Sequence, residues 1–350
     1  MPPASTMRAI TKQSPTAGFE ILNNAPLPNI GPQDVLIRVL KNGICGTDLH
    51  IVEWDSWSAS RIKPPLVFGH EFCGVVEAIG SEVESVKVGA YVTAEMHLAC
   101  GTCPPCRDAK PHICQTVQIA GVDRDGCYAD FIALPAAQVI TLPASISQET
   151  AACLDAVGNA VHSASKVPIE GKTVLVTGCG PIGLFAVAAA RAMGAKAVYA
   201  SDVQAYRLEL AEKVKADAVF NAMDIDVLSA VKDVTHGDGV DVVLEMSGQP
   251  RAIESGLDAL KPGGAMVLLG IPPRPVTLDI PKHVLFKETR IIGVTGREMF
   301  RTWDIMLDLL VSGRLDVSPV ITHTFAMSEF GEAVALMQSG QTGKVLLQVS

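Results

Sequence analysis

Apolar and polar positions alternate over short segments in the first part of the chain. From Met7 to about Thr141 the alternation recurs in runs such as Val35–Leu40 and Gly74–Ile79, with Gly, Pro and Asp between the runs. A period of two places successive side chains on opposite faces of a strand. This part is therefore predicted to be mostly β. A helical passage is expected from about Ser147, a suitable N-cap, because acidic and amide side chains follow in the first turn.

The rhythm changes after Gly171, where apolar runs alternate with Ala-rich stretches such as Ile182–Met193. Strands that alternate with helices are typical of βαβ units and a parallel sheet. The strands are expected at residues 173–177, 197–201, 218–221, 240–245, 265–270 and 291–294. Six such strands complete a doubly wound dinucleotide-binding fold. A helix at 303–310 and a strand at 344–349 are expected to end the chain.

Composition limits the function classes. The chain has 350 residues, of which 48% are hydrophobic and 19% charged, and this length suggests two domains. A formal net charge of −9 and the lack of clustered Lys and Arg argue against a nucleic-acid partner. No apolar run approaches the roughly 20 residues that a membrane span needs, and no secretory signal is recognisable at the start. A cytoplasmic protein that does not cross a membrane is expected.

A glycine-rich turn lies between a predicted strand and a predicted helix. Gly178, Gly180 and Gly183 satisfy the spacing G-x-G-x-x-G, which allows close backbone approach to a pyrophosphate at a helix N-terminus. Asp202 ends the next strand, where a carboxylate accepts hydrogen bonds from ribose hydroxyls and repels a 2′-phosphate. This arrangement predicts NAD rather than NADP, with Arg207 as a candidate flanking the adenosine. The alternative is that the glycines only pack a helix on a sheet and Asp202 is a surface residue.

Four of the nine cysteines lie within fifteen residues, namely Cys100, Cys103, Cys106 and Cys114. Four thiolates suit a closed tetrahedral zinc site, which is structural because no position stays open for a substrate. The alternative is a group of buried thiols or disulfides.

A second, dispersed set contains Cys45, His70 and Glu71. A thiolate, an imidazole and a carboxylate can hold zinc in three positions and leave the fourth for a substrate oxygen, as a catalytic zinc requires. The alternative for this set is that a free cysteine and a single histidine belong to the core.

Together these motifs resemble those of the zinc-containing medium-chain alcohol dehydrogenases, in which a GroES-like catalytic domain precedes a Rossmann domain. The resemblance covers essentially the whole chain. Within the family it is closest to the enzymes that oxidise L-threonine. The strings that carry it are Ile44–Ile51, Glu53–Asp55, Phe68–Glu71, Gly158–His162, Leu244–Gly248, Gly270–Pro273 and Gly296–Phe300.

The resemblance implies a role for each motif residue. Catalytic zinc is expected at Cys45, His70 and Glu71, with Asp155 either as a ligand in some states or as a nearby group that tunes the metal. Thr47 and His50 would relay the hydroxyl proton to solvent through the cofactor ribose, and His97 would take part in substrate selection. The implied NAD contacts are Ile182, Asp202, Arg207, Leu269, Gly270, Ile271, Val294 and Thr295. Structural zinc is implied at the four clustered cysteines, giving two zinc ions per subunit.

The implied organisation is a GroES-like catalytic domain at residues 1–160 and 296–350 and a Rossmann NAD domain at 161–295. The implied reaction is NAD-dependent oxidation of the L-threonine β-hydroxyl to 2-amino-3-oxobutanoate. A polyol or 2,3-butanediol dehydrogenase is the nearest alternative, and a non-catalytic dinucleotide-binding relative is a distant one. Arg297 is a candidate cation for a substrate carboxylate.

The family also implies a homotetramer and functional coupling to a ligase that receives the unstable keto acid. The apolar segment Arg290–Val294 could be an exposed sheet edge that pairs with its copy across a twofold axis. Ala156 and Val157 depart from the family pattern beside Asp155, which bears on how that carboxylate is aimed.

Overall fold

The structure is a computed structural model that describes residues 6–349. It divides into two compact units. The first comprises the chain up to Asp155, His323–Ser339 and the chain from Lys344, and the second comprises Ala156–Thr322 and Gly340–Gly343. The expected class, a doubly wound α/β sheet with a β-rich partner, is confirmed.

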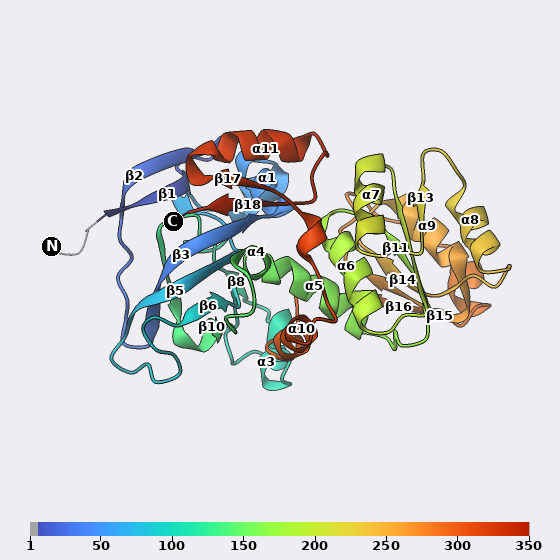
Figure 1. The fold of residues 1–350 in the computed structure, drawn as a ribbon, viewed down its shortest axis with the longest axis horizontal. Helices are drawn as coiled ribbons and strands as arrows, with labels where there is room; N and C mark the ends of the chain where they lie inside the picture. Colours follow the sequence, from blue (N-terminus) through green and yellow to red (C-terminus); the bar gives the residue numbers. More distant parts are fainter. Residues whose placement is uncertain (1–5, 350) are drawn as a thin grey trace. The chain divides into compact units, whose positions relative to one another are not determined.

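The first unit is built on antiparallel strands, as the alternating pattern predicts. Its main sheet has the order β10-β6-β5-β3-β18-β17, and β9 also pairs with β3 (Figure 1). These strands are β3 (Asp34–Ile44), β5 (Phe72–Ile79), β6 (Tyr91–Ala94), β9 (Phe131–Pro135), β10 (Val139–Thr141), β17 (Ile321–Ala326) and β18 (Lys344–Gln348). A second sheet joins β2 (Glu20–Pro26), β1 (Thr6–Lys12) and β4 (Leu66–Val67), and β7 (His97–Leu98) pairs with β8 (Gln118–Ile119).

An aromatic cluster fills the centre of this unit. The rings of Phe68, Tyr128 and Phe330 are fully buried and pack edge to face, with centroids 5.3 to 5.7 Å apart. Phe330 begins α11 (Phe330–Gln338), so a helix from the end of the chain completes the core of the first unit. The other helices of this unit are α1 (Gly46–Glu53), α2 (Ser56–Arg61), α3 (Pro104–Arg107) and α4 (Gln148–Ala151).

The second unit contains the six-stranded parallel sheet that the sequence predicts, in the order β13-β12-β11-β14-β15-β16. Its strands are β11 (Thr173–Thr177), β12 (Ala197–Asp202), β13 (Ala218–Asn221), β14 (Val240–Glu245), β15 (Leu260–Leu268) and β16 (Arg290–Gly293). Helices α6 (Pro181–Ala192) and α7 (Ala205–Lys213) cover one face, while α8 (Val227–Val234) and α9 (Pro250–Ala259) cover the other (Figure 1). The strand order reverses between β11 and β14, and ligands of such sheets bind at that point, beyond the carboxyl ends of the strands.

Some elements differ from the expectation. The helical passage that begins with the Ser147 cap is broken into α4 and α5 (Leu154–Ser165), because the N–H of Cys153 bonds to the Thr150 carbonyl and tightens the turn. Strand β15 begins at Leu260, earlier than expected. The helix expected at 303–310 is confirmed as α10 (Arg301–Val311). Among residues 6–349, no helix has the length and apolar character needed to span a bilayer.

Candidate functional site

The proposed catalytic donors converge because of strand pairing in the first unit. Cys45 directly follows β3, while His70 and Glu71 directly precede β5. The two strands are antiparallel neighbours, with Asn42 opposite Phe72, so the end of one meets the start of the other. One ligand atom from each of the three side chains lies within 4.8 Å of the others.

A buried carboxylate that received no role from the sequence supports this cluster. Asp48 Oδ2 accepts the Cys45 N–H at 2.8 Å and the Tyr128 hydroxyl at 2.5 Å. Asp48 Oδ1 lies 3.8 Å from His70 Nδ1. Asp48 thus fixes the backbone at one donor and lies beside the ring of another, and carboxylates placed in this way orient metal-binding groups. The sequence signal was an acidic residue three positions after Cys45, in the first turn of α1.

The donor set fits a zinc ion. Burial disfavours a charged imidazole, yet Cys45, Asp48 and Asp155 raise the pKa of His70 to about 10, which shows how anionic the surroundings are. Among the described residues, Glu71 Oε1 has no hydrogen-bond partner although it is buried. Buried polar atoms without a partner are costly, and a cation would satisfy this one. Thiolate, imidazole and carboxylate are ligands that zinc takes in proteins.

Asp155, Thr47 and His50 lie around the cluster. Asp155 is buried in the first turn of α5, and its charge raises the pKa values of both His70 and Glu71. Thr47 Oγ1 is 3.6 Å from Cys45 Sγ. His50 lies on the next turn of α1, and its Nδ1 is 2.8 Å from Asp55 Oδ2. His50 is half exposed, so it has access to solvent.

His97 lies in β7 beside a fully buried carboxylate. Glu95 Oε1 is 2.8 Å from His97 Nδ1 and accepts the His97 N–H at 3.0 Å. The Gln138 side-chain amide donates to the carbonyls of both residues. The imidazole is therefore held in one orientation by a rigid part of the sheet.

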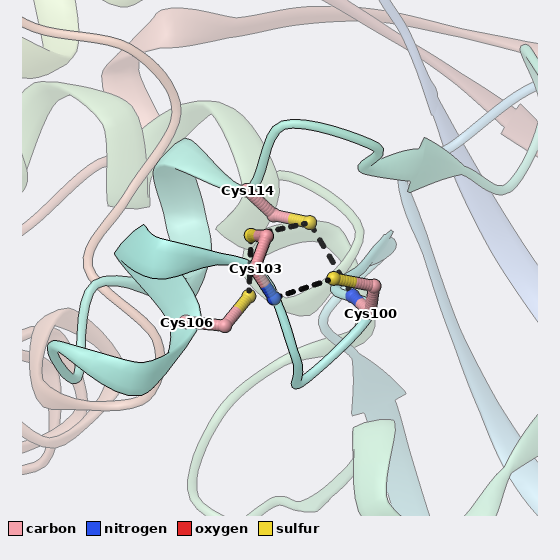
Figure 2. Close-up of side chains that lie close together, drawn as sticks. All are labelled: Cys100, Cys103, Cys106 and Cys114. Atoms are coloured by element: carbon pink, nitrogen blue, oxygen red, sulfur yellow. Dashed lines mark hydrogen bonds between the residues drawn. The ribbon is translucent and has the colours of Figure 1, made fainter.

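The four clustered cysteines form the second donor set (Figure 2). Their sulfurs point toward one another and lie within 4.8 Å, and none of them is in a disulfide. Hydrogen bonds from the hydroxyl and N–H of Thr102 and from the Cys103 N–H lower the pKa of the Cys100 thiol to about 5. A thiol that ionises easily is a ready metal ligand. Four sulfurs in one loop match a closed zinc site.

The glycine-rich turn of the second unit has the geometry that a dinucleotide requires. Gly178 has φ +87°, and a Cβ at Gly183 would collide with the Gly178 carbonyl oxygen. Gly180 is the N-cap of α6, and a Cβ there would meet nothing within 4 Å. The turn therefore needs its first and third glycines for packing, while the second leaves open space at a helix N-terminus, where phosphates bind.

Asp202 is anchored beside this turn. Its Oδ2 accepts the Cys179 N–H at 2.6 Å and its Oδ1 accepts the Gln204 N–H at 2.9 Å. Arg207 lies on α7, and its buried Nε has no hydrogen-bond partner among the described residues. Ile182 is in the first turn of α6. The turn thus places a carboxylate, a cation and a helix N-terminus in one region of the second unit.

The remaining predicted cofactor residues follow the carboxyl ends of strands. Leu269 and Gly270 donate their N–H groups to the Glu245 carbonyl at 3.0 and 3.1 Å, and Ile271 is 88% exposed. Val294 and Thr295 follow β16, and the Val294 N–H bonds to the Leu268 carbonyl. These segments lie at the sheet edge where ligands of doubly wound folds bind.

Glu245, at the end of β14, organises that edge and was missed as a site residue. Its buried carboxylate accepts the N–H groups of Ser247 and Gly248 at 3.0 and 3.1 Å, as well as the Ser247 hydroxyl. Burial raises the pKa of this carboxyl. Ser247 packs against Gly178, so Glu245 shapes the loop beside the glycine-rich turn. In the sequence, Glu245 stood out only as part of Leu244–Gly248, one of the segments that carry the family resemblance.

Arg297, the candidate cation for a substrate carboxylate, is 1% exposed. Its guanidinium lies 5.3 Å from the centroid of the Trp303 ring, and its Nη1 is 3.4 Å from Asn159 Oδ1. The charge is thus engaged by groups of the second unit.

A parallel sheet with a dinucleotide-type turn, together with two zinc-type donor clusters in the other unit, defines a zinc-dependent dehydrogenase. Two family models match: "Alcohol dehydrogenase GroES-like domain" at residues 31–144 and "Zinc-binding dehydrogenase" at 181–312. The chain belongs to the zinc-dependent alcohol dehydrogenase family, as its motifs indicated.

Relatives of nearly the same length give a finer comparison. The L-threonine 3-dehydrogenase of Pyrococcus horikoshii is 46% identical over 98% of this chain and 99% of its own length. That of Bacillus subtilis is 46% identical over 97% of this chain and 98% of its own. A short chain alcohol dehydrogenase from Escherichia coli CFT073, solved in complex with NADH, is 28% identical with a TM-score of 0.90, covering 99% of this chain and 100% of the other.

Replacing Cys103 by Ser tests the cysteine cluster. Because a hydroxyl is a poor zinc ligand, we expect the zinc content to fall from about two ions per chain to about one. Loosening of the loop is expected to lower the thermal unfolding midpoint by about 5 °C or more. Metal analysis and calorimetry measure both. Cys73→Ser, at a buried thiol outside both clusters, is the control and should keep both ions. Retention of two ions by Cys103→Ser would contradict the assignment.

Proposed function

We propose that this protein oxidises the β-hydroxyl of L-threonine with NAD and forms 2-amino-3-oxobutanoate. The observation that carries the proposal is the 46% identity, over almost the whole chain, to relatives named L-threonine 3-dehydrogenase. The reaction removes the hydroxyl proton and a hydride from the β-carbon, and it yields a ketone, NADH and a proton. The buried donor set of the first unit and the glycine-rich turn of the second support this chemistry.

Each donor set has a proposed task. Cys45, His70 and Glu71 would hold catalytic zinc, and the four clustered cysteines would hold structural zinc. When bound, zinc lowers the pKa of an alcohol and NAD accepts a hydride. Asp155 acts at the catalytic donors, either as a ligand or through its charge on His70 and Glu71. His97, fixed by Glu95, contributes to substrate selection.

The hydroxyl proton leaves along α1 in this proposal. Thr47 Oγ1 accepts the proton and passes its own onward, and His50 delivers a proton to solvent from its half-exposed ring. The Ser58 N–H holds the pKa of Asp55 below its ordinary value, so Asp55 is a carboxylate at neutral pH and accepts from His50 Nδ1. That bond leaves Nε2 as the nitrogen that takes up the proton.

The cofactor assignment depends on Asp202. A carboxylate at this position hydrogen-bonds ribose hydroxyls and repels the 2′-phosphate of NADP, which favours NAD. The other proposed NAD contacts are Gly178, Gly180, Ile182, Gly183, Arg207, Leu269, Gly270, Ile271, Val294 and Thr295. Residues 1–160 and 296–350 would form the catalytic domain and 161–295 the NAD domain.

The protein is proposed to work in the cytoplasm as a homotetramer. Nine free thiols suit a reducing compartment. Strand β16 is an edge strand of its sheet, and Leu285, Phe286 and Ile291 expose 63%, 85% and 36% of their surface near it. An apolar sheet edge of this kind suits pairing with a second copy. A ligase acting on the unstable keto acid is a proposed functional partner.

Initial rates of NADH formation test the substrate. We expect kcat/KM for L-threonine to exceed that for sorbitol or 2,3-butanediol by about 100-fold or more, because neither alcohol offers the ammonium and carboxylate that polar recognition of the amino acid uses. NAD should be preferred to NADP. Preference for sorbitol or butanediol would identify a sibling enzyme of the family, and absence of activity with all three would support a non-catalytic relative.

Replacing His50 by Asn tests the proton path. We expect turnover to fall about 100-fold, since a positioned acid or base contributes on that order, while zinc content stays unchanged. Added imidazole buffer should restore part of the rate, because an external base replaces the lost group. Glu53→Gln, on the same helix, is the control. A rate that does not respond to imidazole would contradict the relay.

Replacing Phe286 by Asp tests the assembly. A charge at the exposed edge region should break one of the two interfaces of a tetramer and give a smaller oligomer. Light scattering after size-exclusion chromatography measures the mass. Val88→Asp, at another exposed apolar residue (59%), should leave the mass unchanged. A monomeric wild-type protein would refute the homotetramer.

A further inference from the structure

A buried cation lies directly against one of the proposed zinc ligands. Lys344, the first residue of β18, places its Nζ 2.6 Å from Glu71 Oε2, and the two side chains are 2% and 1% exposed. The same Nζ donates to the Ile44 carbonyl at 2.8 Å. Strand β18 pairs with β3 so that Val345 lies opposite Ile44, which fixes the lysine beside the residue that precedes Cys45.

The backbone leaves room for this ion pair. Gly43 lies in β3, and a Cβ there would meet Glu71 Oε2 at 2.5 Å and Lys344 Cε at 3.0 Å. Any larger residue at position 43 would collide with both groups and with the Ala152 carbonyl oxygen. The contact between Glu71 and Lys344 is therefore set by residues of β3, β18 and the start of β5. It is not a flexible pairing at the surface.

The two oxygens of Glu71 differ in one respect. Oε2 forms the ion pair with Lys344. Apart from that contact, neither oxygen of this buried carboxylate has a hydrogen-bond partner within residues 6–349, and the carboxylate belongs to the metal-type cluster. A charged donor thus holds one oxygen and leaves the other for a metal.

We infer that Lys344 is a positioning residue of the zinc site: it restricts Glu71 to binding the metal through Oε1 alone. This inference rests on the proposed catalytic zinc at Cys45, His70 and Glu71. A carboxylate can bind through one oxygen or two, and a second bound oxygen would occupy the position that a catalytic zinc keeps open. By holding Oε2, the ammonium preserves that position. It also offsets part of the negative charge, which keeps zinc from binding too tightly.

The test replaces Lys344 by Met in the full-length protein. The catalytic zinc is exchanged for Co²⁺, whose visible absorption weakens as the number of ligands rises. We expect weaker absorption than in the wild-type Co²⁺ protein, because Oε2 becomes free to bind. We also expect metal loss to a chelator to require a roughly 10- to 100-fold higher chelator concentration, a range typical of changes in the groups behind metal ligands.

Lys41→Met is the matched control. Lys41 is a buried lysine of β3 whose Nζ lies 2.7 Å from Glu149 Oε1 on α4. The pair lies outside the donor cluster, so its loss should leave the cobalt spectrum unchanged. If Lys344→Met does not fold, Lys344→Gln is measured instead, since its amide keeps a donor for the Ile44 carbonyl without the charge. An unchanged spectrum in the variant that folds, or weaker metal binding, would overturn the inference.

Metal analysis separates this inference from the proposed function. A wild-type protein with two zinc ions per chain, one of them retained in Cys103→Ser, supports the catalytic site and makes the Lys344 result decisive. A wild-type protein whose only zinc is lost in Cys103→Ser would refute the catalytic site itself, and the inference would fall with it.

Discussion

The register of β3 with its neighbours is the constraint on which the first unit's site depends. Strand β3 pairs with β5 on one side and β18 on the other, and it ends immediately before Cys45. These two pairings bring His70 and Glu71 from one neighbour and Lys344 from the other to the same place. A slip by one residue would turn alternate side chains to the opposite face and disperse the donors. The site is therefore set by backbone hydrogen bonds deep in a sheet, and its geometry is as rigid as the fold.

The same convergence concentrates charge where water is excluded. Asp48, Glu71, Asp155 and Lys344 are all buried, and an isolated charge in such surroundings would be strongly unfavourable. Here Asp48 accepts hydrogen bonds from Tyr128 and the Cys45 N–H, and Glu71 and Lys344 compensate each other. The cluster nevertheless keeps an anionic excess, as the raised pKa of His70 shows. Because a dication offsets that excess, metal binding and folding of this unit are coupled.

Features encoded by neighbouring residues were predictable, and features that depend on distant partners were not. The six parallel strands and the glycine-rich turn follow from local periodicity and from steric demands that only glycine meets. The clustered cysteines are close in sequence, so their convergence could also be foreseen. The short helix α1 was not predicted. The role of Asp48 could not be predicted either, because Tyr128, the partner of its carboxylate, is 80 positions away. Lys344 and Ile44 are 300 positions apart, and nothing near Lys344 in the sequence marks it.

Substrate choice follows a different logic from the metal chemistry. A zinc donor set acts on any alcohol that reaches it, so selectivity must come from polar groups around the substrate. Arg297 is buried against Trp303 and Asn159, and its charge is already engaged. His97, in contrast, is held through Nδ1 and its backbone N–H by a buried Glu95. If His97 contacts the substrate, as proposed, an imidazole fixed in this way would discriminate by hydrogen-bond direction more than by size. A site built from such groups rejects an analogue that lacks the matching polar atom far more strongly than one that is only smaller.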